Sequence, residues 1–529
     1  MIRRRTISAI SPLTRFALFT LMVLTVGGEH LQAQNAKSDE TLNRLIQAVK
    51  AIDQQRFQEA ENLLNSILAN TPNDGDANNL LGVVRAKQDR PGEAEKLFRR
   101  AILHAPKHLS ARINLGELLI TTDRTDQART VLLEAHKLAP ERVEINLKLA
   151  TLYADKAEYK SALHYLELLP REAANRDYFL VKLKTLLGLK RIDEARSLAR
   201  SFIQTAVGDT QAHVEFAMLL ARSGLDDDGL NILETARQNE SGSFPVLYAL
   251  GIINANLKRY DTAEEHLTAA IKLKPDDVAT LRALARIARA KGNLEKSLSH
   301  LVEARRLAPK VPAVLYEFGV TAFEMDLLLD ALPVFEQLHR DYPNEPAYLY
   351  ALAAVRWKKG ETVETTRLMK TYVASRPRDA AGFYLLGAAL LQQDQFPQAR
   401  VALERSLTLK TDSDAEYLLG VVLDKLGNRA AAIEIFRRVI RTRPDHAAAF
   451  SALGTAYREE GSYPEARVAL ERAVELQAND LRANYQLGLV YAKLGDKEAA
   501  KKMFARADDL RSRQRNEESV ILKLIEPPN

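Results

Sequence analysis

The sequence predicts an all-α protein, an α-solenoid of stacked helical hairpins, and three observations support this fold class. Prolines that each precede a new helical segment recur with a period of about 34 residues: Pro72, Pro106 and Pro140, then Pro275, Pro309, Pro343 and Pro377. Apolar residues follow helical spacing in both halves of each interval. Glycine and proline are modest in number, 23 and 19 of 529 residues. A period of this length indicates hairpins that pack mainly on their neighbours.

Residues 1–33 predict a secretory signal peptide that is not part of the fold. Arg3, Arg4 and Arg5 precede an apolar run over residues 16–26, and Ala33 offers a small residue for cleavage. The apolar run is shorter than the roughly 20 residues of a transmembrane helix, and an uncleaved anchor is the alternative. We expect residues 34–40 to be a short linker. We also expect a periplasmic or secreted chain that has no transmembrane segment after signal removal.

Residues 447–480 show one repeat unit most clearly. One face of the first helix carries residues at spacings of three, four and seven: Phe450, Leu453, Gly454 and Tyr457. Gly461 and Ser462 interrupt this helix. The second helix repeats the spacing with Ala466, Leu470 and Ala473. We expect small residues where the two helices come close, Gly454 on the first helix and Ala466 on the second.

This pattern resembles the tetratricopeptide repeat family, which carries Leu-Gly and aromatic residues on its first helix and Ala, Phe, Ala and Pro on its second. Fourteen units follow the pattern, beginning at residues 41, 75, 109, 143, 176, 210, 244, 278, 312, 346, 380, 413, 447 and 481. They fill residues 41–514 and leave residues 515–529 as a C-terminal cap or tail. The family's large aromatic residue is missing in several units, where Arg44, Asn78, Leu247, Leu281 or Glu416 stands instead. The resemblance implies a right-handed superhelix whose first helices line a concave groove.

The repeat pattern is weakest between residues 170 and 243. Pro170 comes early, the unit at 176 has no closing proline, and Gly229 replaces the usual alanine. We interpret this stretch as a looser joint between an N-terminal and a longer C-terminal block. Ordinary drift of the pattern in a long array is the alternative.

Composition and motifs argue against several classes of function. The sequence has no cysteine, which excludes disulfides, thiolate zinc sites and a cysteine-linked lipid anchor. The net charge of +6 falls to +3 without residues 1–33, because four arginines and Glu29 lie there. No basic run is long enough to indicate a nucleic-acid partner. The sequence also lacks a phosphate-binding glycine loop, a His-Glu-x-x-His motif and a hydrolase-type serine motif. We therefore expect no enzyme activity, no metal and no cofactor.

The candidate binding residues lie on the first helices. The resemblance points the fifth place of each unit into the groove, and in six consecutive units this place holds Tyr248, Arg282, Tyr316, Tyr350, Tyr384 and Tyr417. A run of tyrosines predicts a ligand-contacting surface, because tyrosine combines a large contact area with few rotatable bonds and a hydroxyl group. Packing of the tyrosines between units is the alternative.

The unit at 278 differs from its neighbours. Arg282, Arg286 and Arg289 recur at i, i+4 and i+7, which places them on one face of its first helix. Guanidinium groups bind carboxylates in a two-point fashion, so the stripe favours an acidic peptide, a C-terminal carboxylate or an anionic sugar. Pairing with Glu264 or Glu265, or simple solvation, is the alternative. Trp357, the only tryptophan, stands at place twelve of the unit at 346 and is also expected on the groove side.

Together these patterns predict a non-catalytic protein–protein interaction scaffold of the bacterial cell envelope, which binds a peptide or protein in its groove. One alternative is a repeat-bearing component of a polysaccharide or protein export or assembly machine. Another is a repeat-bearing partner of a glycosyltransferase, because the family also occurs fused to sugar transferases. We expect residues 520–525 to cover the open end of the array or to pair as a strand with a partner.

Overall fold

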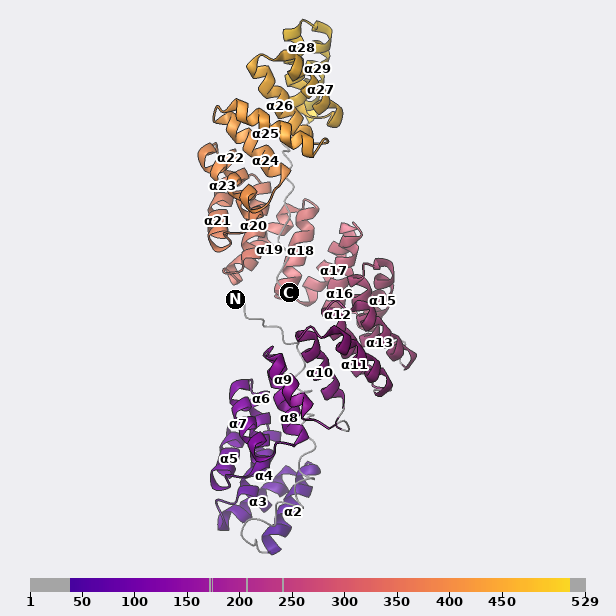
Figure 1. Ribbon diagram of the computed structural model, residues 1–529, viewed down its shortest axis with the longest axis vertical. Coiled ribbons are helices and arrows are strands. Elements are labelled where there is room, and N and C mark those ends of the chain that lie inside the picture. The colour runs from indigo at the N-terminus through magenta and orange to yellow at the C-terminus, as the bar shows by residue number, and fades with distance from the viewer. Residues whose placement is uncertain (1–38, 171–172, 174, 206–207, 240–241, 514–529) are drawn as a thin grey trace. The chain divides into compact units, whose positions relative to one another are not determined.

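In the computed structural model, which describes residues 39–170, 173, 175–205, 208–239 and 242–513, the regular elements are α-helices (Figure 1). The prediction of an all-α chain of consecutive hairpins is confirmed for these residues. The predicted signal peptide and the C-terminal tail lie outside them, and of the predicted linker only Asp39 and Glu40 are described. These two residues already belong to the first turn of a helix. None of the described helices has the length and apolar character needed to cross a bilayer.

The chain divides into two compact units, residues 1–263 and 264–529. The first unit holds α2 (Asp39–Asp53), α3 (Phe57–Asn70), α4 (Gly75–Lys87), α5 (Pro91–His104), α6 (Leu109–Thr121), α7 (Thr125–Leu138), α8 (Val143–Asp155), α9 (Tyr159–Glu167), α10 (Arg176–Gly188), α11 (Ile192–Thr205), α12 (Thr210–Arg222), α13 (Asp226–Asn239) and α14 (Phe244–Asn256). The division falls inside α15 (Tyr260–Leu273).

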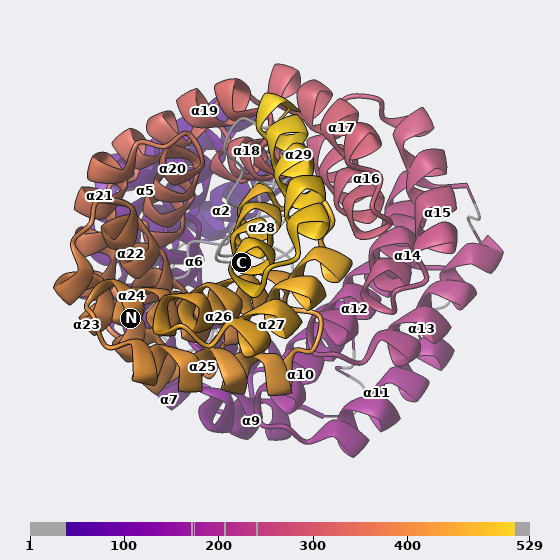
Figure 2. The same ribbon diagram turned by 90° about the horizontal axis from the view of Figure 1, so that it is seen from above.

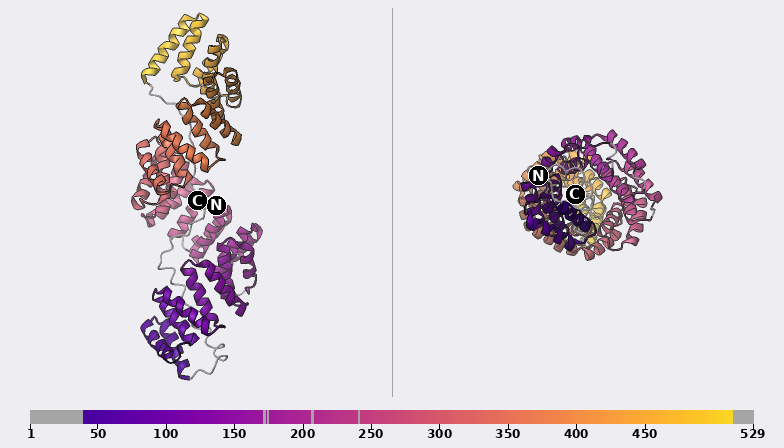
Figure 3. Two further views of the ribbon diagram at one scale, coloured as in Figure 1. Left: turned by 90° about the vertical axis from the view of Figure 1, so that its left-hand side faces the viewer. Right: turned by 90° about the horizontal axis from the view of Figure 1, so that it is seen from below.

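The second unit continues with α16 (Val278–Ala290), α17 (Leu294–Leu307), α18 (Pro312–Glu324), α19 (Leu328–Asp341), α20 (Pro346–Lys358), α21 (Thr362–Ser375), α22 (Ala380–Gln392), α23 (Phe396–Leu409), α24 (Ser413–Lys425), α25 (Arg429–Thr442), α26 (Ala447–Glu460), α27 (Tyr463–Leu476), α28 (Leu481–Leu494) and α29 (Lys497–Arg513). Even-numbered helices are the first helices of the repeats and odd-numbered helices are the second. Figure 2 and Figure 3 show the same hairpins from further directions.

Aspartate caps explain where many of the first helices begin. Asp277 accepts a hydrogen bond from the backbone N–H of Thr280 at 2.8 Å, which satisfies one of the unpaired donors at the start of α16. The same kind of cap is made by Asp74, Asp209, Asp379, Asp412 and Asp480. The sequence thus encodes the start of these hairpins with a polar residue that favours a cap over a helix interior.

One residue with positive φ follows many of the first helices and starts the turn into the second. Gly461, the residue predicted to interrupt the unit at 447, has a φ of +84°. Glycine adopts this left-handed conformation without a steric penalty. At the equivalent turns Asp326 and Asp394 have φ values of +62° and +57°. Aspartate tolerates this conformation better than most residues, because its short polar side chain can bond locally.

Small residues allow the two helices of a hairpin to approach, as predicted. A Cβ atom on Gly454 would lie 2.5 Å from Leu470 Cγ and 3.1 Å from the carbonyl oxygen of Ala466. A Cβ on Gly229 would lie 2.9 Å from the carbonyl oxygen of Ala217. Gly229 therefore permits close packing of α13 on α12, and its presence is not by itself a sign of looseness.

The stretch predicted as a looser joint begins beside a reduced hairpin. Helix α9 has 9 residues, whereas the second helices on either side of it have 14. The buried cluster at this hairpin is small and consists of Ala150, Ala154, Ala162, Leu166 and Val181. The division between the compact units lies outside residues 170–243, so the joint itself stays a prediction.

Polar side chains replace the missing aromatic residue in some units and satisfy backbone groups there. The side-chain amide of Asn78 donates to the carbonyl oxygens of Pro72 and Asp74, at 3.0 and 2.8 Å. Glu416 accepts a hydrogen bond from Arg438 at 2.9 Å. Asn78 thereby satisfies two backbone carbonyls at the start of α4, and Glu416 links α24 to α25.

Candidate functional site

The candidate site consists of two groups of residues in the second compact unit. We call Arg282, Arg286 and Arg289 on α16 the arginine stripe. We call the fifth-place tyrosines of α18, α20, α22 and α24 the tyrosine row, which comprises Tyr316, Tyr350, Tyr384 and Tyr417.

Two members of the arginine stripe are held in two-point ion pairs with the next first helix. Arg282 donates from Nε and Nη2 to the carboxylate of Glu317 on α18, at 2.9 and 2.8 Å. Arg289 binds Glu324 in the same way, at 2.7 and 2.5 Å. The two forks join α16 to α18, and their planar geometry fixes the direction of both guanidinium groups.

The sequence reasoning missed these acidic partners. It named Glu264 as a possible partner, but Glu264 accepts a hydrogen bond from Lys291 at 2.7 Å and also pairs with Lys296. The hydrogen bond from Lys291 is the main reason why the pKa of Glu264 is lowered. The stripe therefore takes its carboxylates from the repeat that follows it in the chain.

Arg286 is the exception within the stripe. Its Nε lies 3.4 Å from Oε1 of Glu317, an atom that Arg282 already binds at 2.8 Å. The Arg286 side chain is 60% exposed, compared with 23% for Arg282 and 43% for Arg289. Arg286 is thus the most exposed and least tightly bound guanidinium of the three.

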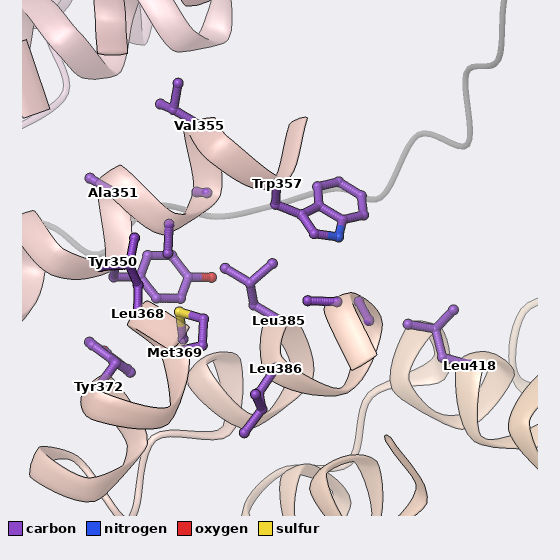
Figure 4. Packing of buried hydrophobic residues seen from close by; sticks show 14 of the residues in the cluster. Tyr350, Ala351, Val355, Trp357, Leu368, Met369, Tyr372, Leu385, Leu386 and Leu418 are labelled. Atoms are coloured by element: carbon purple, nitrogen blue, oxygen red, sulfur yellow. The ribbon is translucent and has the colours of Figure 1, made fainter. Parts of the chain in front are cut away.

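The tyrosine row does not form an open surface. Tyr316 and Tyr350 are 2% and 1% exposed, and Tyr384 and Tyr417 are partly buried against the same core. The prediction that all four tyrosines are presented to a ligand is wrong for Tyr316 and Tyr350, because packing covers both rings. Figure 4 shows Tyr350 beside Leu385 and Met369. The alternative prediction, in which the tyrosines pack between units, therefore describes Tyr316 and Tyr350.

Burial also changes the acidity of the tyrosines. It raises the pKa of Tyr350 and of Tyr384 well above the ordinary value for tyrosine. The pKa of Tyr372, whose ring centroid lies 5.4 Å from that of Tyr350, is raised mainly by burial. Its hydroxyl also donates to Asp379 at 2.5 Å, which adds to the shift. The neutral rings are therefore part of the core at any pH near neutrality.

Trp357 is buried, whereas Tyr248 is half-buried. The Trp357 side chain is 6% exposed, and its indole Nε1 has no hydrogen-bond partner among the described residues. Packing therefore covers most of the side chain that was expected on the groove side. Tyr248 lies on α14 in the first compact unit, where its half-buried ring stacks on Phe244 with centroids 6.0 Å apart.

A constant sequence separation of 35 relates many contacts between consecutive first helices. Arg282 to Glu317 and Arg289 to Glu324 both have this separation. So do Asn79 and Asn114, which share a hydrogen bond of 2.9 Å. The same spacing places Lys358 over the ring of Phe323, 5.2 Å from its centroid. Places five and twelve of one unit therefore lie beside places six and thirteen of the next, and reading the sequence at this offset would have found the missed acids.

The described residues contain no group of three or more histidine, aspartate or glutamate side chains placed to hold a metal ion.

Comparison with known families identifies the repeats. A family described as TPR repeat matches residues 454–495. Families described as tetratricopeptide repeat match residues 47–108, 85–135, 248–312, 380–405, 414–446 and 481–514. Together these segments cover about half of the chain.

Curated relatives resemble this chain over part of their length. It is 20% identical to the human protein O-mannosyl-transferase TMTC3 over 45% of this chain and 27% of that protein. It is 23% identical to anaphase-promoting complex subunit 3 of Schizosaccharomyces pombe over 40% of this chain and 33% of that protein. The chain therefore spans about a quarter to a third of the length of these relatives.

Two solved structures align with most of this chain. The Cut9–Hcn1 hetero-tetramer of the APC/C covers 90% of this chain and 95% of that chain, with 15% identity and a TM-score of 0.45. The P58(IPK) TPR domain covers 84% of this chain and 100% of that chain, with 14% identity and a TM-score of 0.32.

Proposed function

Because this chain belongs to the tetratricopeptide repeat family, whose members bind protein partners, we propose that it is a non-catalytic interaction scaffold of the bacterial cell envelope. In this proposal the chain binds a peptide or protein partner along the first helices of its repeats. The resemblance to mannosyl-transferases covers about a quarter of TMTC3, so we take from it the repeats and not the catalysis.

The arrangement of α16 is the observation that carries the proposal. Most first-helix side chains near the candidate site are buried in the core, as are Tyr316, Tyr350 and Trp357. The arginine stripe instead keeps polar groups at the surface, and two-point ion pairs to α18 hold two of them, those of Arg282 and Arg289, in place. A surface whose charged groups are already ordered loses less conformational entropy when a partner binds.

The envelope location rests on the sequence. Residues 1–33 have the charged start, the short apolar run and the small residue of a secretory signal. The chain also has no cysteine, which avoids mispairing in an oxidising compartment. Intact-mass measurement of protein recovered from the periplasm tests the signal peptide: cleavage near Ala33 supports it, and a mass that still includes Met1 favours the uncleaved anchor instead.

Site-specific photo-crosslinking in living cells tests the binding face. A benzoylphenylalanine group replaces Ala290 on α16 in one protein and Val302 on α17 in the control, because both positions are exposed and lie in the same hairpin. We expect an envelope protein to be crosslinked from position 290 and not from position 302. Crosslinks from position 302 alone, or from neither position, would overturn the proposed binding face.

A further inference from the structure

Resting on the function proposed above, we propose that the arginine stripe recognises a carboxylate group of the partner peptide, and that Arg286 is the residue that binds it. Arg282 and Arg289 already have carboxylate partners within this chain. Their guanidinium groups are each engaged by a carboxylate of this chain, at distances between 2.5 and 2.9 Å.

Among the residues that the structure describes, the ion pairs between α16 and α18 leave one cation of the stripe in excess. Three arginines on α16 face two glutamates on α18, and Glu317 serves both Arg282 and Arg286. Glu317 binds Arg282 with both carboxylate oxygens, so its contact with Arg286 is a single longer approach of 3.4 Å. The excess charge therefore lies on Arg286, the most exposed of the three side chains.

The geometry also explains how a ligand gains access. A guanidinium group has five N–H donors in a planar fork, and at Arg286 the single 3.4 Å approach to Glu317 is its one ion pair with a described residue. An incoming carboxylate can bind Arg286 without breaking either fork to Glu317 or Glu324. Glu317 competes with that carboxylate, because its own negative charge lies beside the same guanidinium.

This competition makes the proposal testable in both directions. Removing the charge of Arg286 weakens binding of a carboxylate. Removing the charge of Glu317 strengthens it, because the competing anion is lost. A purely structural role for the stripe predicts the same loss of folding from both changes and no opposite effects on binding.

The experiment uses residues 34–529 and four dye-labelled peptides as probes, with binding followed by fluorescence anisotropy. Amidated hexaglutamate carries side-chain carboxylates, and hexaglutamine with a free C-terminus carries a terminal carboxylate. Amidated hexaglutamine carries neither and is the reference. Amidated hexalysine reports nonspecific adhesion. The two carboxylate peptides distinguish an acidic side chain from a chain end as the recognised group.

We expect at least one carboxylate peptide to bind the parent protein more tightly than the reference does. Arg286→Gln should weaken that binding about fivefold, the upper end for an exposed ion pair. Glu317→Gln should tighten it by a similar factor. Arg306→Gln on α17 is the matched control, because Arg306 is 66% exposed and also forks a glutamate, at 2.6 and 2.9 Å to Glu303. It should leave binding unchanged.

Three outcomes would overturn the proposal. They are equal binding of all the peptides by the parent, unchanged binding by Arg286→Gln, and equal losses in Arg286→Gln and Arg306→Gln. Circular dichroism and thermal unfolding of each variant show that it is folded. The photo-crosslinking result does not depend on carboxylates, so failure here leaves the interaction scaffold standing.

Discussion

Arg282 of the arginine stripe and the tyrosine row stand at the fifth place of consecutive repeats and have different surroundings. Arg282 and Tyr350 are both fifth in their units, yet the arginine stays partly exposed and the tyrosine is 1% exposed. The difference lies in the next first helix. Arg282 meets Glu317, whereas Tyr350 lies beside Leu385 (Figure 4). For these two residues, the residue at place six of the following unit is a carboxylate beside Arg282 and an apolar side chain beside Tyr350.

The largest expected loss of stability follows from replacing a buried tyrosine of the tyrosine row. Tyr350→Ala should lower the free energy of unfolding by about 3–5 kcal/mol, because it leaves a cavity in a close-packed core. Urea unfolding followed by circular dichroism measures the change. Tyr485→Ala is the control, since Tyr485 is also fifth in its unit but 40% exposed. Equal losses in the two variants would contradict the distinction between buried and exposed places.

Exchanging the neighbouring residue should produce the next largest effect. Ala351 occupies in α20 the place that Glu317 has in α18, and it is fully buried. Ala351→Glu should cost about 2–4 kcal/mol, because it places a carboxyl group in an apolar core without a cation at the fifth place of the preceding unit. Equilibrium unfolding at pH 7 measures it. If stability were unchanged, place five of one unit would not lie beside place six of the next unit in this part of the array.

Alkaline pH should destabilise the fold by ionising the tyrosines and should leave the arginine stripe unchanged. The pKa values of Tyr350, Tyr372 and Tyr384 are raised in the folded state. A tyrosine whose pKa is raised by folding contributes its full stabilisation below the pKa that it has in the unfolded chain, about 10. That stabilisation is lost as the pH rises above this value. Above that pH, each of the three tyrosines should lower the free energy of unfolding by up to about 1.4 kcal/mol per pH unit. The ultraviolet absorbance of tyrosinate should rise together with unfolding; ionisation of these rings before unfolding would contradict the prediction.

The smallest change in the free energy of unfolding is expected for a substitution in the arginine stripe. Arg286→Ala should change the free energy of unfolding by less than about 0.5 kcal/mol, because exposed ion pairs contribute little. Thermal unfolding compared with the parent protein measures it. A loss of about 2 kcal/mol or more, well beyond the range of ordinary surface substitutions, would mean that Arg286 supports the fold. Its assignment as a ligand-binding residue would then fail.

The hairpins followed from the sequence because their signals are local. Proline spacing, aspartate caps, and the glycine at position 454 that meets Leu470 all act within one unit. The exposure of the candidate residues did not follow, because it depends on contacts between units. Three contacting residues can be identified only when places in neighbouring repeats or on neighbouring helices are compared: Glu317, Leu385 and the partner of Glu264. The arginine stripe was therefore found as a pattern, while its partners were missed.

The paired forks between α16 and α18 also limit how this array can change by gain or loss of whole repeats. Deleting residues 312–345 would remove one complete unit and leave every other hairpin intact. It would, however, place Arg282 beside Ala351 and Arg289 beside Lys358, so that three arginines would face an alanine and a cation. Loss of this one unit would therefore leave both forked arginines without the carboxylates that they bind now.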